Sequence, residues 1–254
     1  MIQPGVLLLL ALGLFASAGA DDSLSVAVAS NFRSAAEDLA DAFTIQSRVP
    51  VRLSSGSTGK LYAQIVNGAP YDIFLAADME RPRLLSDSGE GIEGSLHLYA
   101  DGKLVLVSAD PDIKERDCIR ALREGSYRKL AIANPATAPY GAAAKAYLLA
   151  AGLWDDAESR IIMGENISQA FQFVATRNAT LGIVSASQLA GSNPLAAISC
   201  QWAIDVPEDY AVHQGGIILH RTQMPDEARL FMKYLRSDTA RALMIAHGYE
   251  VPGI

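Results

Sequence analysis

The feature that most constrains the fold is the alternation of short apolar segments with amphipathic helical patterns along nearly the whole chain. "LSVAVAS" (24–30) and "KLVLVSA" (103–109) are apolar runs of strand length, whereas "FRSAAEDLADAFTIQ" (32–46) places Ala35 and Leu39 on one side of a helix. Alternating strands and helices favour parallel sheets, and near-continuous apolar strands favour sheets that are buried on both faces. The sequence therefore predicts an α/β fold with mainly parallel sheets and helices on both faces.

The same patterns assign most of the remaining chain. Roughly 230 mature residues suit one large domain or two small ones. We expect further strands at 49–55, 71–77, 129–135 and 215–220, helices at 60–68, 80–86, 115–124, 140–154 and 168–178, a strand that runs into a helix within 180–190, and a helical C-terminal part at about 225–247.

The N-terminal residues indicate export. "VLLLLALGLFA" is an apolar run too short for a comfortable membrane span, and Ala18-x-Ala20 follows it as a small-residue cleavage site. We therefore expect a signal peptide at 1–20, a mature chain from Asp21 and a periplasmic location. "MIQPG" has no Lys or Arg, and the alternative is a retained anchor helix.

Charge and cysteine content exclude several classes of partner. The formal net charge is −7, which argues against nucleic acid and anionic membranes as partners. The two cysteines and four histidines show no zinc-ligand spacing, so we expect neither a metal site built from side chains nor a cofactor. In an exported chain, Cys118 and Cys200 form a disulfide or remain two buried thiols, and the sequence leaves both alternatives open.

"SSGSTGK" (54–60) looks like a nucleotide-binding phosphate loop. However, Ser54 occupies the place of the first glycine, and Leu61 occupies the place of the hydroxyl residue that holds magnesium. Two of the four fixed positions of that motif therefore fail. What remains is a helix start with small residues and hydroxyls, whose unpaired N–H groups can hold an anion.

Similar residues occur at four places where a helix is expected to begin after a strand. They are Ser30-Asn31, 56–59, "NPATAPYG" (134–141) and "GENIS" (164–168). Each alone fits ordinary helix capping, but α/β sheets bind ligands beyond the carboxyl ends of their strands. Four such joins therefore predict an anion site, with Lys60, the only cation among them, on the solvated side of its helix.

The chain resembles the periplasmic molybdate-binding proteins, which capture substrate for molybdate ABC transporters. The likeness runs from "VAVASNF" to "GYEVP" and is strongest in "SSGSTGKLYAQIVNGAPYDIFLAAD", "IANPATAPYG" and "LGIV". It implies a two-lobed periplasmic-binding-protein fold with the oxyanion in the interlobe cleft, one lobe at 21–98 plus 213–254 and the other at 99–212. It also implies binding of molybdate or tungstate, no enzymatic activity, a membrane-embedded ABC permease as partner, and a monomer.

The resemblance also implies which residues contact the ligand, and molybdenum would be held only as the bound oxyanion. The contacts fall on Ser30, Asn31, Thr58, Tyr140 and Ile167, with Ser57 and Ser185 as secondary candidates. Some members use a tyrosine hydroxyl at the position of Ser185, and the serine side chain found here is much shorter.

Three alternatives stay open at this point. The first is a binding protein for another tetrahedral oxyanion such as sulfate. The second is an exported hydrolase that uses Ser57 or Ser185, although no Gly-x-Ser-x-Gly elbow is present and no general base is placed for either serine. The third is a sensor domain for a membrane partner that uses the same ligand clamp.

Overall fold

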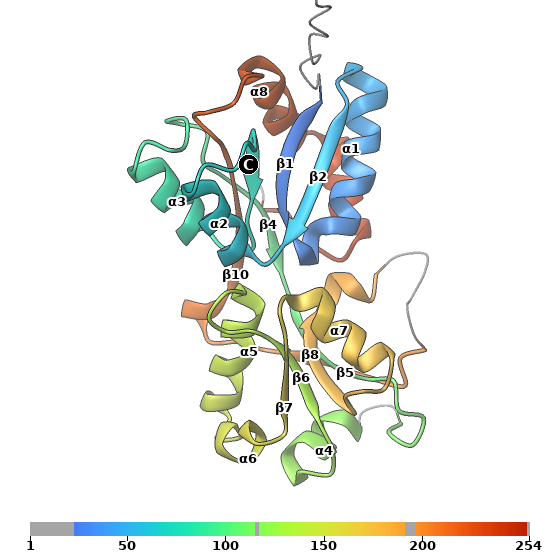
Figure 1. Cartoon of the computed structure of the whole chain (residues 1–254). Coiled ribbons are helices and arrows are strands. Elements are labelled where there is room, and N and C mark those ends of the chain that lie inside the picture. Colours follow the sequence, from blue (N-terminus) through green and yellow to red (C-terminus); the bar gives the residue numbers. More distant parts are fainter. Residues whose placement is uncertain (1–22, 115–116, 191–196, 253–254) are drawn as a thin grey trace, which may run out of the picture.

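The computed structural model describes residues 23–114, 117–190 and 197–252, and it shows two lobes that are each built on a five-stranded sheet (Figure 1). The first-lobe sheet has the order β2-β1-β3-β10-β4, and the second-lobe sheet has the order β7-β6-β8-β5-β9. The first sheet comprises β1 (Leu24–Ala29), β2 (Val51–Gly56), β3 (Ile73–Leu75), β4 (His97–Gly102) and β10 (Val212–Ile218). The second comprises β5 (Leu104–Ser108), β6 (Leu130–Ala133), β7 (Ile161–Gly164), β8 (Leu181–Ser185) and β9 (Cys200–Ile204).

Helices cover both faces of each sheet. The first lobe contains the 3-10 turn η1 (Ser30–Phe32) and helices α1 (Arg33–Ser47), α2 (Thr58–Val66), α3 (Glu80–Asp87), α8 (Pro225–Tyr234) and α9 (Asp238–Ala246). The second contains α4 (Asp117–Glu124), α5 (Pro139–Ala150), α6 (Trp154–Glu158), α7 (Ile167–Ala175) and the 3-10 turns η2 (Ala186–Gln188) and η3 (Glu208–Tyr210).

The alternating side chains of β1 show why both faces of its sheet are apolar. Val26 packs in one buried cluster with residues of α1 and α8, whereas Ala27 packs in a second cluster with Leu61 of α2. On the α1 side, the rings of Phe43 and Phe231 meet edge to face with centroids 5.0 Å apart, a favoured aromatic geometry. The α/β fold expected from the sequence pattern is confirmed, and so are the two lobes that the family resemblance implied.

The sheets are mixed rather than mainly parallel. Strand β1 pairs in parallel with β2 and β3, and β6 pairs in parallel with β7 and β8. The pairs β3–β10, β4–β10, β5–β8 and β5–β9 are antiparallel. Apolar periodicity shows where a strand lies in the sequence but does not report its direction, so these antiparallel pairs could not be recognised from the pattern.

The chain leaves the first lobe after β4 and returns to it at β10, and these two strands are neighbours in the first sheet. Strand β4 stays in the first sheet through Gly102, and β5 of the second sheet begins at Leu104, so the first crossing lies at Lys103. The return crossing lies between Ile204 and Val212. Strand β4 thus extends the first sheet beyond the boundary at 98 that the resemblance implied, because it pairs antiparallel with β10.

Some elements differ from the expected ones. Strands β4, β7 and β9 were not expected, and the helix expected at 140–154 ends at Ala150, where Gly152 follows with a φ of +68°. A left-handed residue at this point stops a helix, and glycine adopts that conformation without strain. The expected signal peptide lies outside the described residues, and none of the described helices is long and apolar enough to cross a membrane.

The structure decides between the two alternatives for the cysteines. Cys118 of α4 and Cys200 of β9 form a disulfide within the second lobe, and both residues are buried. The disulfide links α4 to β9, which is an edge strand of the second-lobe sheet, and it does not cross between the lobes.

Candidate functional site

A small cavity lies between the two lobes, and it is enclosed mainly by the starts of helices. The space in it that is open to the centre of a water-sized molecule is only about 10 Å³, and no charged side chain of the described residues lines it. Its lining comprises Ala29, Ser30, Asn31, Gly56, Ser57, Thr58, Ala77, Ala138, Pro139, Tyr140, Asn166 and Ile167. The structure therefore brings all five primary candidate residues to one place.

Parallel strand register is what gathers these helix starts. In the first lobe the last paired residues of β1 and β2 are Ala29 and Gly56, and in the second lobe the last pair of β6 and β7 is Ala133 and Gly164. When neighbouring parallel strands end at residues that pair with each other, the helices that follow both strands begin at the same edge of the sheet. The two lobes turn these edges toward each other across the cavity.

The backbone at these positions can donate hydrogen bonds. Thr58 and Ile167 are the first residues of α2 and α7, Tyr140 is the second residue of α5, and Asn31 lies in η1, which continues directly into α1. N–H groups in a first helical turn have no intrahelical acceptor, and the helix dipole favours negative charge near them. The arrangement therefore supplies N–H donors from both lobes without a counter-charge.

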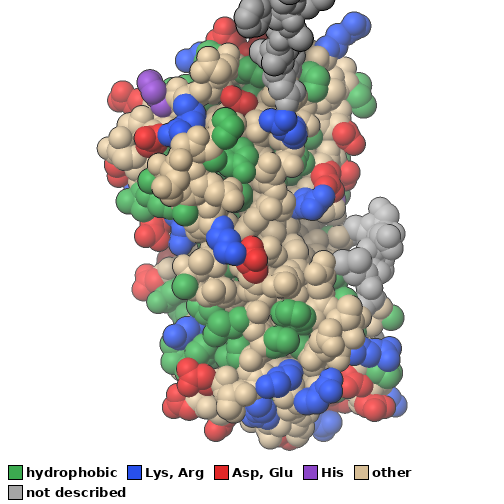
Figure 2. Space-filling view, in the orientation of Figure 1, with side chains coloured by type: hydrophobic (Ala, Val, Ile, Leu, Met, Phe, Trp, Pro, Cys, Tyr) green, Lys and Arg blue, Asp and Glu red, His purple; other side chains and the backbone are tan. Residues whose placement is uncertain are grey.

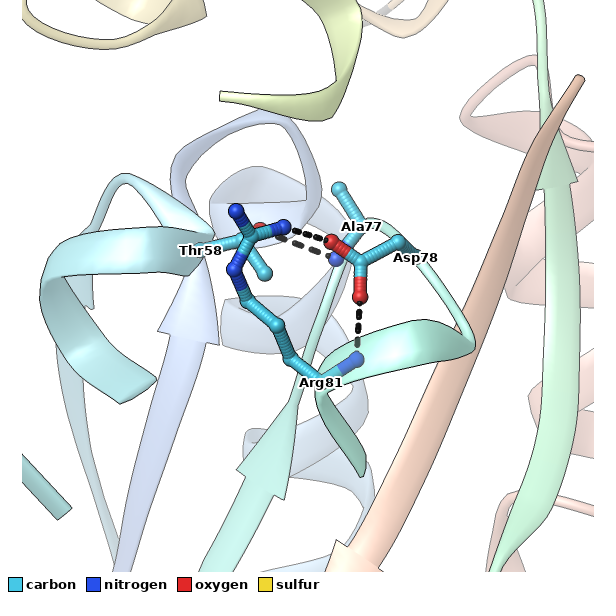
Figure 3. Close-up of polar contacts among 4 residues, drawn as sticks. All are labelled: Thr58, Ala77, Asp78 and Arg81. Atoms are coloured by element: carbon cyan, nitrogen blue, oxygen red, sulfur yellow. Dashed lines mark hydrogen bonds and ion pairs between the residues drawn. The ribbon is translucent and has the colours of Figure 1, made fainter. Parts of the chain in front are cut away.

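Hydroxyl groups add to these backbone donors. Thr58 Oγ1 accepts the Ala77 N–H at 3.1 Å, which leaves the hydroxyl proton of Thr58 available to the cavity (Figure 3). Ser57 is 2 % exposed, and its Oγ has no hydrogen-bond partner among the described residues. Ser30 is similarly buried beside them. Ser57 thus lies in the cavity wall together with the primary candidates.

The carboxylate of Asp78, which follows the lining residue Ala77, is paired with an arginine. Asp78 follows Ala77 and accepts the Arg81 N–H at 2.9 Å, and it also pairs with the Arg81 guanidinium (Figure 3). Burial raises the pKa of the Asp78 carboxyl, and the contacts with Arg81 oppose that shift. Asp72 accepts the Ser25 N–H at 2.7 Å near the other end of β3. The two carboxylates therefore do not form an acid–base pair.

Tyr140 extends away from the cavity toward the strand that crosses between the lobes. A Cβ atom on Gly102 would lie 2.0 Å from Tyr140 Oη, so the ring fits only because residue 102 is glycine. Burial raises the pKa of the Tyr140 phenol, which keeps the group neutral. Ser185 is fully buried, its Oγ lies 2.7 Å from Ser187 Oγ, and it is not among the residues that line the cavity.

Behind the cavity, a buried polar network holds Asn31. The Asn31 Nδ2 group donates to Gln214 Oε1 at 2.7 Å and to Tyr249 Oη at 3.1 Å. The Tyr249 hydroxyl in turn donates to the Asn31 carbonyl at 2.7 Å. Sequence reasoning missed Gln214 and Tyr249, and no local pattern marks them, because they reach Asn31 from more than 180 residues away in the chain.

The two lobes are in contact around the cavity. Figure 2 shows the surface on one side, where a basic and an acidic side chain lie side by side at the level at which the lobes meet. Lys60 Nζ lies 2.8 Å from Glu165 Oε1 of the other lobe, and both side chains are about half exposed. The expected solvated position of Lys60 is confirmed, and its ion pair with the second lobe was not expected.

The chemistry of the site is that of a neutral binding pocket. Its donors are N–H and O–H groups, and the described residues include no cluster of His, Cys, Asp or Glu that could hold a metal ion. A buried anion with several charge-assisted hydrogen bonds suits such a pocket. A ligand oxygen that kept its proton would present a donor to a wall of donors. The geometry favours a compact, fully deprotonated oxyanion.

Comparison with known proteins agrees with this geometry. Residues 24–250 match the family model described as "Bacterial extracellular solute-binding protein". The chain is 40% identical over 239 residues to the molybdate-binding protein ModA of Azotobacter vinelandii, with 93% of each chain covered. It is 34% identical over 244 residues to ModA of Rhodobacter capsulatus, with 95% of this chain and 93% of the relative covered.

The fold agrees as well. The solved structure of the Azotobacter vinelandii periplasmic molybdate-binding protein superimposes with a TM-score of 0.83 at 37% identity, and the match covers 91% of this chain and 100% of that one. A match of this extent includes both lobes.

Proposed function

Because this chain belongs to the bacterial extracellular solute-binding proteins and, among them, to the molybdate-binding proteins, we propose that it captures molybdate and delivers it to an ABC permease. Tungstate has the same charge and shape and is expected to bind as well. The observation that most strongly supports this proposal is the interlobe cavity, which is lined by helix starts from both lobes and by no charged side chain among the described residues.

The proposed contacts follow from the donors at the cavity. Ser30 and Thr58 supply hydroxyls, and Asn31, Thr58, Tyr140 and Ile167 supply backbone N–H groups. Ser57 is added because its buried hydroxyl has no partner among the described residues. Ser185 is not included, because its hydroxyl pairs with Ser187 outside the cavity. A desolvated dianion gains roughly 1.5–3 kcal/mol from each good hydrogen bond of this kind.

The location and the organisation of the chain are part of the same proposal. Residues 1–20 act as a signal peptide, and the mature protein is a periplasmic monomer. We propose a first lobe that runs from Asp21 to the end of β4 and resumes at β10, with a second lobe in between. Closing the two lobes over the oxyanion makes a compact form that the permease can distinguish from the open one.

Calorimetric titration tests the function directly. The mature protein should bind molybdate and tungstate tightly, whereas sulfate and phosphate should bind weakly or not at all. Saturating molybdate should also raise the free energy of unfolding, by about 2.7 kcal/mol at a hundredfold excess over Kd. Tight binding of sulfate instead would assign the chain to another oxyanion, and no binding of any of the four anions would reject the proposal.

We predict that Lys60→Ala changes molybdate affinity by less than about fivefold. The reason is that exposed ion pairs such as Lys60–Glu165 contribute at most about 1 kcal/mol and are screened by salt. Calorimetry at low and at moderate salt measures this, with Arg33→Ala, which removes an exposed ion pair within α1, as the control. A loss as large as that caused by removing a cavity hydroxyl would mean that Lys60 contacts the anion.

A further inference from the structure

We infer that Ser168, Ser187 and Gly59 hold the two lobes together over the ligand and thereby set the rate at which the oxyanion is released. The inference rests on the proposed function. It goes further because none of these residues is among the proposed ligand contacts. Each makes a hydrogen bond between the lobes, and each bond involves a residue that contacts the ligand in the proposed function or its immediate neighbour. The name "closure seam" is used below for these three bonds.

The first bond of the closure seam is made by Ser168 in α7. Its Oγ donates to the carbonyl oxygen of Ser30 at 3.1 Å, so it reaches from the second lobe to the first. The carbonyl of Ser30 and the N–H of Asn31 belong to the same planar trans peptide group and point in opposite directions. A bond to this carbonyl therefore continues, through one peptide group, into the N–H proposed to bind the oxyanion. Hydrogen bonds in such a chain polarise and strengthen one another.

The second bond is made by Ser187 in η2. Its Oγ donates to the carbonyl oxygen of Asn31 at 3.2 Å, and the Tyr249 hydroxyl, 2.9 Å from the same Oγ, donates to that carbonyl as well. Ser187 is 6 % exposed, so its bond is shielded from water. Both carbonyls of the short segment Ser30-Asn31 thus accept a hydrogen bond from the second lobe.

The third bond lies on the other side of the cavity. The Gly59 N–H donates to the carbonyl of Thr137 at 2.8 Å and so joins α2 to the loop that precedes α5. A Cβ atom on Gly59 would lie 2.9 Å from this carbonyl oxygen and 3.1 Å from Thr137 Cα. Both neighbours are backbone atoms, which cannot rotate away as a flexible side chain does. The glycine next to Thr58 therefore allows the lobes to approach closely, which explains its place in "SSGSTGK" without a nucleotide.

These positions predict a kinetic role. The oxyanion can leave only when the lobes separate, and separation breaks the closure seam. Association begins with the lobes apart, when the seam is not yet formed. Loss of one seam bond should therefore speed release and leave the association rate nearly unchanged, as is usual for changes within one interface. A neutral hydrogen bond of ordinary strength corresponds to about a three- to tenfold change in rate.

The test uses the dissociation of radiolabelled molybdate into an excess of unlabelled molybdate, together with stopped-flow association. Ser168→Ala and Ser187→Ala should each release molybdate about three- to tenfold faster than the parent protein at an unchanged association rate. The matched control is Ser108→Ala. Ser108 is also a buried serine of the second lobe, but its hydroxyl donates to Thr180 at 2.8 Å within that lobe. This variant should release molybdate at the parent rate.

Gly59→Ala provides a second, steric test of the same inference. The added methyl group should keep the lobes from closing fully, so molybdate should shrink the particle less in small-angle scattering and leave it faster than in either serine variant. Parent-like release from all three seam variants, or equal acceleration in Ser108→Ala, would overturn the inference while molybdate binding by the parent still supports the proposed function. A parent protein that does not bind molybdate would reject both.

Discussion

Thr58→Ala should weaken molybdate binding by about tenfold to more than a hundredfold, and Ser30→Ala should do the same. Thr58 is 1 % exposed, and its oxygen already accepts the Ala77 N–H, so its proton is free to be directed at the ligand. Removing one donor from a desolvated dianion costs about 1.5–3 kcal/mol, which corresponds to this change in Kd. Calorimetric titration with molybdate measures the effect.

Two further variants separate lost ligand contact from lost folding. Thr58→Ser retains the hydroxyl and should keep most of the affinity. Thr44→Ala removes a threonine hydroxyl that bonds to the Val49 carbonyl far from the cavity, and it should bind like the parent. The melting temperature without ligand should show that Thr58→Ala remains folded, although its Ala77 N–H loses an acceptor. Parent-like binding by both Thr58→Ala and Ser30→Ala would place the oxyanion elsewhere.

Opening the disulfide should lower the free energy of unfolding of the second lobe by about 4–5 kcal/mol. Cys118 and Cys200 are separated by 82 residues, and in the chain-entropy model a cross-link of this span removes that much entropy from the unfolded chain. Denaturant unfolding under oxidising and reducing conditions measures the difference, and the variant Cys118→Ala/Cys200→Ala should unfold like the reduced protein.

Molybdate should stabilise the oxidised and reduced proteins alike. The bridge lies within the second lobe, and neither cysteine lines the cavity, so opening it leaves the contact between the lobes in place. Equal Kd values in the two redox states, measured at a temperature at which both are folded, are the expected result. A ligand response that appears only in the oxidised protein would show that the bridge supports the cavity itself.

Much of the site could be predicted from the sequence because its donors belong to local motifs. Small and hydroxyl residues at the start of a helix indicate helix capping or an anion site, and only a few neighbouring residues are needed to recognise them. Ser30, Thr58 and the segments before α5 and α7 show this pattern. The same holds for the failure of 54–60 as a phosphate loop, because that motif requires fixed residues at fixed spacing.

The polar residues behind the cavity could not be predicted for the opposite reason. Gln214 and Tyr249 reach Asn31 from the far end of the chain, and Ser187 reaches it from the other lobe. A lone glutamine or serine in a sequence gives no sign of the group that it will contact. The crossing strand β4 was also missed, because "HLYADG" is too polar to read as a buried strand and is only half-buried in the structure.

Patterns along the chain were enough to place most strands and helices, to locate hydroxyls and N–H donors at helix starts, and to show that Lys60 is the one charged residue of "SSGSTGK". These properties depend on neighbours along the chain. The tertiary structure alone decided the direction of the strands near the crossings, the pairing of Cys118 with Cys200, and the bonds by which Ser168, Ser187 and Gly59 join the lobes. Those features depend on which distant segments meet when each lobe packs its own core and when the two lobes come together, and no local pattern specifies this.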